Sequence, residues 1–171
     1  MDNPFGDLLI QIQERLKNIA PQIREVSEDK GQLEAYDVRP AVSFPCGLID
    51  FDFNFNDIGQ NIQIGAGMVI FRLAFPPFSS ASSLMPVPVR EKALAYSDYE
   101  MLVYQALHGW RPNGFAPLSR RSAKTEKRMD TLRVREIAFE TEFEDYSAQD
   151  QSDKTAINNF EVIPDSLTNS S

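Results

Sequence analysis

Residues 48–57 read LIDFDFNFND, a stretch in which apolar and polar side chains alternate strictly. One side of an extended chain here carries only apolar groups, namely Ile49, Phe51, Phe53 and Phe55. The other side carries only polar groups, namely Asp50, Asp52, Asn54 and Asn56. Because successive side chains of a β-strand point to opposite faces, this pattern predicts a strand with one face in the core and the other toward solvent or a partner.

The row of oxygen-bearing side chains also matches the beginning of a calcium-binding loop, D-x-[DN]-x-[DN]-G. That loop needs glycine at its sixth position and a bidentate glutamate at its twelfth, but Phe55 and Asn61 stand there. Alternate side chains of one strand also lie roughly 7 Å apart, too far to converge on one small ion. The sequence therefore predicts no metal site, and the row is interpreted as the outer side of a strand.

A longer strand is predicted at residues 61–75, and the sequence NDIGQ before it favours an antiparallel hairpin with residues 48–57. Its second half, MVIF, is apolar on both faces, as is typical of a central strand. Another strand is predicted at residues 132–146. The apolar phase shifts by one residue near Gly47, which predicts a β-bulge or a sharp bend, and again near Arg135, which predicts another β-bulge.

Two helices are predicted. The first spans about Asn3 to Ile19, with apolar residues at helical spacing and Pro21 after its end. The second spans roughly Arg90 to Trp110 and carries the single tryptophan on its apolar face. Together these elements predict an α+β fold, with a mainly antiparallel sheet of four or five strands and two helices packed on one face.

The chain of 171 residues has the length of one domain with an appendage. Its hydrophobic content of 42% is enough to form a real core. The composition becomes polar late in the chain. We therefore expect a single α+β domain over residues 1–146, followed over residues 147–171 by a polar C-terminal tail or docking arm.

The formal net charge of -8 makes the chain a poor candidate for wrapping nucleic acid, because Lys and Arg bind phosphates. A single cysteine excludes an intrachain disulfide. The N-terminus lacks the features of a secretory signal, and no apolar run approaches the roughly 18 residues that cross a bilayer. We therefore expect a soluble cytoplasmic protein without a signal peptide or membrane contact.

Positive charge is concentrated between residues 120 and 135, where seven bases and two acids give a net of +5 and leave -13 on the rest. The sequence FAPLSRRSAKTEKRMDT is interpreted as a polar connector. Its basic residues include Arg120, Arg121, Lys124, Lys127 and Arg128. A solvated loop is the simplest interpretation, but the same residues also suit an acidic surface of another subunit or a phosphate backbone.

The sequence indicates no catalytic chemistry. His108 is the only histidine, and it lies at a predicted helix end, where a protonated imidazole complements the helix dipole. Cys46 lies in an apolar phase, as a small core residue does. The glycines of GQNIQIGAG lie inside a strand pattern and do not open a helix, so they form no phosphate-binding loop. We expect no catalytic residues, no cofactor, no metal and no enzyme activity.

The order of elements and several short sequences resemble a known protein family. A helix precedes RPAVSFPCGLIDFDF and a long strand, and YEMLVYQALHGW, FAPLSRRS and LRVREIAFETEFED follow in that order. Over residues 7–146 this arrangement resembles the small tail-terminator and tail-completion proteins of long-tailed phages and prophages.

The resemblance implies a structural protein that needs no chemistry. Members of the family form rings, often of six subunits, that cap the tail tube and join it to the neck. We therefore expect ring self-assembly, contacts with tail-tube and neck proteins, and passing contact with DNA in the lumen. Assembly in the host cytoplasm and incorporation into the virion tail are also expected.

A closed ring requires complementary surfaces on the two sides of each subunit. The basic connector of one subunit would face acidic residues of the next, drawn from Asp50, Asp52, Asp57, Glu140, Glu142 and Glu144. Alternatively, the connector points into the lumen where DNA passes. Three other functions stay open. They are another neck component such as a head-completion protein, a small-ligand or peptide-binding α+β module whose Phe-rich strand lines a cavity, and an enzyme with an unfamiliar site, which clustered perturbed carboxylates in a cleft would favour.

Overall fold

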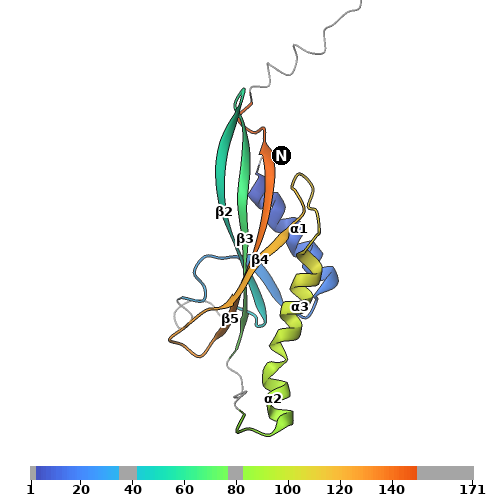
Figure 1. Ribbon diagram of the computed structural model, residues 1–171, viewed down its shortest axis with the longest axis vertical. Helices are drawn as coiled ribbons and strands as arrows, with labels where there is room; N and C mark the ends of the chain where they lie inside the picture. Colours follow the sequence, from blue (N-terminus) through green and yellow to red (C-terminus); the bar gives the residue numbers. More distant parts are fainter. Residues whose placement is uncertain (1–2, 35–41, 77–82, 150–171) are drawn as a thin grey trace, which may run out of the picture.

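The computed structural model describes residues 3–34, 42–76 and 83–149. It contains a five-stranded sheet with the order β1-β2-β3-β5-β4. The strands are β1 (Glu25–Glu28), β2 (Cys46–Gly59), β3 (Ile62–Phe75), β4 (Ser119–Thr125) and β5 (Arg133–Asp145). The helices are α1 (Pro4–Ile19), α2 (Val87–Leu94) and α3 (Tyr96–Leu107). Helices α1 and α3 lie against one face of the sheet (Figure 1), which confirms the predicted α+β fold.

Strands β2 and β3 form the predicted antiparallel hairpin. Gln60 and Asn61 connect them, with φ angles of 54° and 57°. Positive φ at both central positions is what a type I′ turn requires. Strand β3 lies between β2 and β5, which confirms it as a central strand, and β1 pairs in parallel with the first residues of β2.

Two phenylalanines of β2, Phe51 and Phe53, pack against the core, whereas Phe55, also expected there, is 40% exposed. The ring of Phe5, in α1, lies 5.2 Å from Phe51 and 5.3 Å from Phe53 between ring centroids. Phe143 of β5 lies 5.8 Å from both Phe5 and Phe53. Such tilted and edge-on aromatic pairs add roughly 0.5–1.5 kcal/mol each to the effect of buried area. The alternation in β2 therefore fixes α1 on the sheet.

The two β-bulges predicted near Gly47 and Arg135 are wrong, because β2 and β5 both pair with β3 without interruption at these positions. The apolar phase shifts because both faces of the sheet are covered by apolar clusters near Gly47 and Arg135. The second cluster consists of Leu33, Val42, Cys46, Leu48, Ala74, Leu132 and Val134. A register shift does occur in β4, between Arg120 and Ser122.

The basic connector is not entirely a loop, because Ser119–Thr125 form β4 and pair antiparallel with β5 at the edge of the sheet. Five of the seven β4 residues are exposed. An edge strand that is exposed on both faces has no apolar alternation, which is why the sequence pattern indicates a connector there. Its charged side chains are typical of an edge that avoids uncontrolled pairing.

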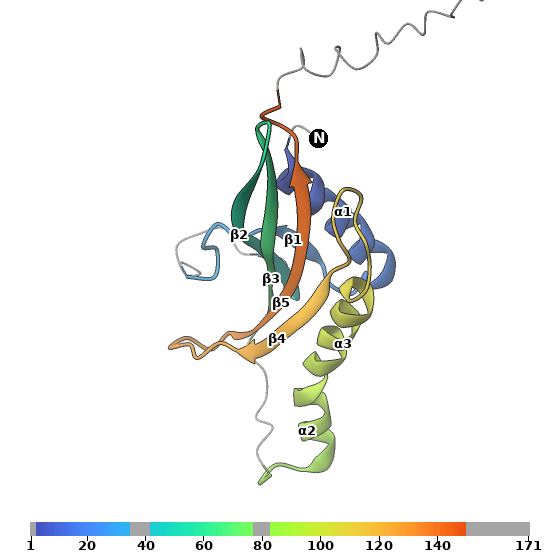
Figure 2. The same ribbon diagram turned by 45° about the horizontal axis from the view of Figure 1, so that its top comes forward.

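The predicted second helix is divided at Ala95 into α2 and α3. Three residues of α3 are buried, namely Val103, Ala106 and Leu107. In α2 only Ala93 is buried, and Leu94 is 45% exposed. Figure 1 and Figure 2 both show α2 extending past the sheet, at the end opposite the β2–β3 turn. Helix α2 therefore has little contact with its own domain.

We expect Trp110→Ala to lower the free energy of unfolding by about 1.5 kcal/mol. Trp110 follows α3, is partly buried against the core and lies with its ring centroid 5.6 Å from the guanidinium carbon of Arg15. Truncating a fully buried aromatic costs roughly 3–5 kcal/mol, and a half-buried one costs less. Urea unfolding followed by circular dichroism measures the change, with the fully exposed Met129→Ala as the control. Equal midpoints for the two variants would show that the Trp110 ring does not stabilise the fold.

Candidate interaction surfaces

The face of the sheet that α1 and α3 leave uncovered carries parallel rows of acidic and apolar residues. Strand register places Met68 of β3 between Asp52 of β2 and Glu140 of β5. Directly opposed residues share a face of the sheet. The acidic residues of this face are Asp50, Asp52, Glu140, Glu142 and Glu144, and the apolar row between them is Ile64, Ala66, Met68 and Ile70. These nine residues are called the outer face below.

The outer face brings together five of the six acidic residues singled out from the sequence. The sixth, Asp57, is five residues from Asp52 along β2 and therefore points to the opposite side of the sheet. Its carboxylate accepts a hydrogen bond from Nε2 of Gln63 at 2.8 Å. The structure thus places Asp57 near the β2–β3 turn, apart from the outer face.

Arg72 lies in β3 two residues after Ile70, the last apolar residue of the outer face. It is the centre of a network of ion pairs, and its side chain is only 12% exposed. Its guanidinium donates hydrogen bonds to Asp29 at 2.7 Å and to Glu34 and Glu126 at 2.6 Å. Arg128 also donates to Glu126, at 3.2 Å. The hydrogen bond from Arg72 is the main reason that the pKa of Glu126 lies below its ordinary value. The network joins the segments after β1 and after β4 to the sheet, so Arg128 has a structural role.

Two further basic residues form ion pairs across β4 and β5 in the same chain. Nη2 of Arg121 lies 2.5 Å from Oε2 of Glu140, and Nζ of Lys124 lies 2.9 Å from Oε1 of Glu136. The Arg121 and Lys124 side chains are 56% and 64% exposed. Exposed pairs of this kind contribute about 0–1 kcal/mol, so a neighbouring carboxylate can replace Glu140 or Glu136 at little cost.

Arg120 and Lys127 complete the basic set. The guanidinium carbon of Arg120 lies 3.8 Å from the ring centroid of Tyr104, and the Tyr104 ring stacks on His108 at 4.9 Å. The backbone N–H of Arg120 donates to Nδ1 of His108 at 3.1 Å. His108 is the C-cap residue of α3, as its place in the sequence predicts. Lys127 is exposed, and it has no ion pair within the described ranges.

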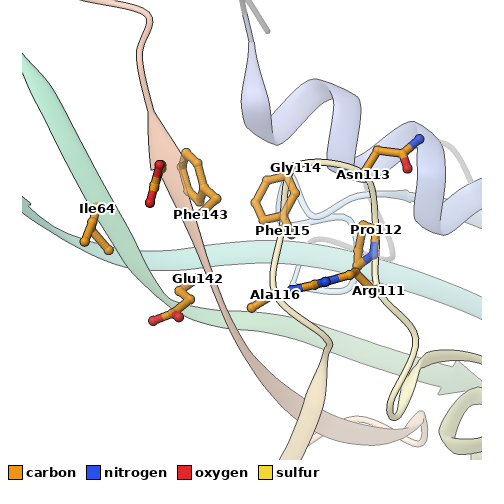
Figure 3. A pocket seen from close by; sticks show the side chains of 10 residues that line it. Ile64, Arg111, Pro112, Asn113, Gly114, Phe115, Ala116, Glu142 and Phe143 are labelled. Carbon is orange, nitrogen blue, oxygen red and sulfur yellow. The ribbon is translucent and has the colours of Figure 1, made fainter.

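A surface hollow of about 510 Å³ lies between the segment after α3 and the ends of β3 and β5. Figure 3 shows Arg111 and Phe115 on the loop side and Ile64, Glu142 and Phe143 on the strand side. The rings of Phe115 and Phe143 lie 4.7 Å apart. Among the described residues that line the hollow, the charged groups are one guanidinium and two carboxylates, with neither a histidine nor a cysteine.

Cys46 is fully buried, and burial raises the pKa of its thiol to about 12. A thiol that stays protonated and has no access to solvent is a poor nucleophile. Cys46 therefore acts as a core residue, as predicted. Within the described ranges, no three or more His, Cys, Asp or Glu side chains are grouped so that they could hold a metal ion.

Exposed apolar side chains gather around α2. Val87 is 53% exposed and Leu94 45%, and Met85, just before the helix, is 37% exposed. Met101 of α3 is 52% exposed and follows Leu94 by seven residues, as Leu94 follows Val87. The sequence of α2 alone does not indicate this exposed apolar surface, because the segment is short and contains both basic and acidic side chains.

Comparison with protein-family models gives no match, and comparison with curated proteins gives none. Among solved structures, a chain of the virion of a native gene transfer agent particle is similar, with 14% sequence identity and a TM-score of 0.49. The similarity covers 82% of this chain and 97% of that chain. An identity and a TM-score this low indicate nothing about the function of this chain.

Across the described ranges, none of the helices has the length and apolar character needed to span a membrane.

Proposed function

We propose that this chain is a structural protein of a phage or prophage tail, similar to a tail terminator at the head–tail joint, and that it acts by forming a ring on the tail tube. The observation that carries the proposal is the outer face, an ordered set of acidic and apolar rows on a sheet face that the helices leave uncovered. The resemblance over residues 7–146 supports the same function. In this function the chain binds and positions other proteins and catalyses no reaction.

Opposite edges of the sheet differ in charge, which suits head-to-tail contact between identical subunits. Strand β4 contributes Arg120, Arg121 and Lys124 at one edge, and no acidic residue lies in it. At the other edge, β1 contains Glu25 and Glu28 and no basic residue, and it pairs with β2 only as far as Ile49. Within the described ranges no strand pairs with that side of β2 beyond Ile49. A contact that joins different surfaces of identical subunits closes into a ring when the rotation permits.

A position of β4 in the lumen, facing DNA, is the alternative arrangement. It is less favoured because the chain carries a formal net charge of -8, which opposes the approach of a phosphate backbone. Affinity for a phosphate backbone depends on the number of unpaired cations that reach it. A neck component such as a head-completion protein uses the same kind of surfaces, and its binding partner would distinguish it from a terminator.

We expect the purified protein to self-associate at low salt and to dissociate as salt rises, because exposed charges are screened within about 8–10 Å at physiological ionic strength. Light scattering over a range of concentrations and salt measures the mass, and negative-stain electron microscopy at low salt shows whether the oligomers are closed rings. The double variant Arg121→Glu and Lys124→Glu should weaken the association. A monomer under all conditions, both alone and with isolated tail tubes, would contradict the proposed function.

A further inference from the structure

Helix α2 is short and packs poorly on its own domain, so contacts within that domain do not account for its stability. Isolated helices below roughly 12–15 residues are marginal in water, and helices in proteins owe most of their stability to a packed apolar side. Helix α2 has eight residues, and only Ala93 is buried. Its Val87 and Leu94 lie seven residues apart, on the same side of the helix, and both are about half exposed. Residues 85–94, called the α2 arm below, therefore present an apolar stripe that lacks a cover in the described structure.

The outer face has a complementary composition. Its apolar row runs along β3 and is only partly buried. Beside Ala66 a hollow of about 270 Å³ opens between β3, β5 and the segment before β4. Pro117, Arg121, Glu140 and Glu142 are among the residues that line it. The charged groups around this hollow can contact the charges of an incoming helix.

We propose that the α2 arm of one copy of this chain packs on the outer face of the next copy, with Val87 and Leu94 against the β3 row. The charges of the two surfaces are complementary. The arm carries Arg90, Lys92 and Glu91, a net of +1, and the outer face carries five carboxylates with Arg121 beside them. The inference rests on the proposed ring and adds a second contact to the one proposed between the two edges of the sheet.

A contact between two α2 arms is the competing arrangement. It would bring Arg90 and Lys92 of both copies close together, and like charges at short distance oppose association. It would also leave the apolar row of the outer face exposed. The α2 arm and the upper part of the sheet lie at opposite ends of the molecule (Figure 1), so the proposed contact cannot form within one chain, and in a ring it joins successive copies.

Cysteine cross-linking of the full chain tests the contact directly. The single variants Ala66→Cys and Leu94→Cys and the double variant are treated with a short bismaleimide at low salt. Cys46 gives little background, because it is buried and its thiol pKa is raised to about 12. We expect a ladder of covalent oligomers from the double variant, only covalent dimers when the two single variants are mixed, and monomers from each single variant alone. The pair Ala66→Cys with Ile10→Cys, which places the second thiol at a 58%-exposed position of α1, is the matched control and should give no ladder.

The outcomes distinguish a failure of the proposed contact from a failure of the proposed ring function. Dimers of Leu94→Cys alone would show arm-to-arm contact and overturn the proposal. Closed rings in the microscope without a ladder from the double variant would also overturn it. A ladder from oligomers that never close would support the contact and count against the ring. The double variant Val87→Asp and Leu94→Asp should raise the dissociation constant by roughly tenfold or more, whereas Ile10→Asp should leave it within about threefold. Equal effects of the two would also overturn the proposal.

Discussion

Replacing Arg72 with methionine is expected to lower the free energy of unfolding by roughly 3–5 kcal/mol. Methionine fills much of the volume of the arginine side chain but removes the guanidinium that binds Asp29, Glu34 and Glu126. The side chains of Asp29 and Glu126 are only 11% and 17% exposed, so the variant would leave partly buried carboxylates without their main partner. Urea unfolding followed by fluorescence of the single tryptophan measures the loss.

The matched control is Arg121→Met, which removes a guanidinium from an exposed pair with Glu140. Exposed ion pairs contribute about 0–1 kcal/mol, so this variant should unfold close to the natural protein. The same chemical change at two arginines thus separates the effect of burial from the effect of charge. If both variants lose the same stability, the network around Arg72 is not the structural element that its geometry indicates.

The pH dependence of stability should change in the same variant. Arg72 lowers the pKa of Glu126 in the folded protein relative to its ordinary value of roughly 4.3. A carboxylate with a depressed pKa stabilises the fold above that ordinary value, and this stability is lost as the pH falls through the folded pKa. The difference between the natural protein and Arg72→Met should therefore be largest near neutral pH and shrink below about pH 4. A difference that grows on acidification would contradict this role of Glu126.

Much of the fold is predictable because its central elements are covered on one side only. Phe51 and Phe53 alternate with Asp50 and Asp52, and this period of two follows from a strand with the α1 side buried and the other side open. The apolar stripe and Asn3 cap of α1 are equally local signals, since the Asn3 side chain accepts a hydrogen bond from the backbone of the first turn. These elements need no knowledge of distant residues.

Other parts depend on partners far away in the sequence. The phase shift at Gly47 follows from the second cluster, in which Leu33 and Leu132 cover the opposite side of the sheet. The residues near Gly47 in the sequence do not indicate that these two leucines pack there. The ion pairs of Arg72 reach 43 and 54 residues along the chain. The edge strand β4 has little buried surface and hence no apolar pattern. The acidic residues of the outer face were predictable as two rows, but only the register of β3 shows that an apolar row lies between them.

Substituting alanine at Gly47 is expected to lower the free energy of unfolding by roughly 2–3 kcal/mol, because the added methyl group overpacks the core. A Cβ at Gly47 would lie 2.2 Å from Cζ of Phe71, far inside van der Waals contact. Phe71 is completely buried among the residues under α1 and α3, so its ring has little room to move. The absence of a side chain at Gly47 is therefore what allows a phenylalanine at position 71.

A double-mutant cycle with Phe71→Leu tests this explanation. Phe71→Leu alone should destabilise the protein, because it leaves a cavity under the helices. In the double variant the methyl group of alanine occupies part of the space that the ring vacates, so the combined loss should be smaller than the sum of the two single losses by at least about 1 kcal/mol. Thermal and urea unfolding of the four proteins give the coupling. The φ angle of Gly47 is not among the positive ones, so its backbone does not require glycine. Additive losses would therefore contradict the explanation that Gly47 is needed for the room it leaves to Phe71.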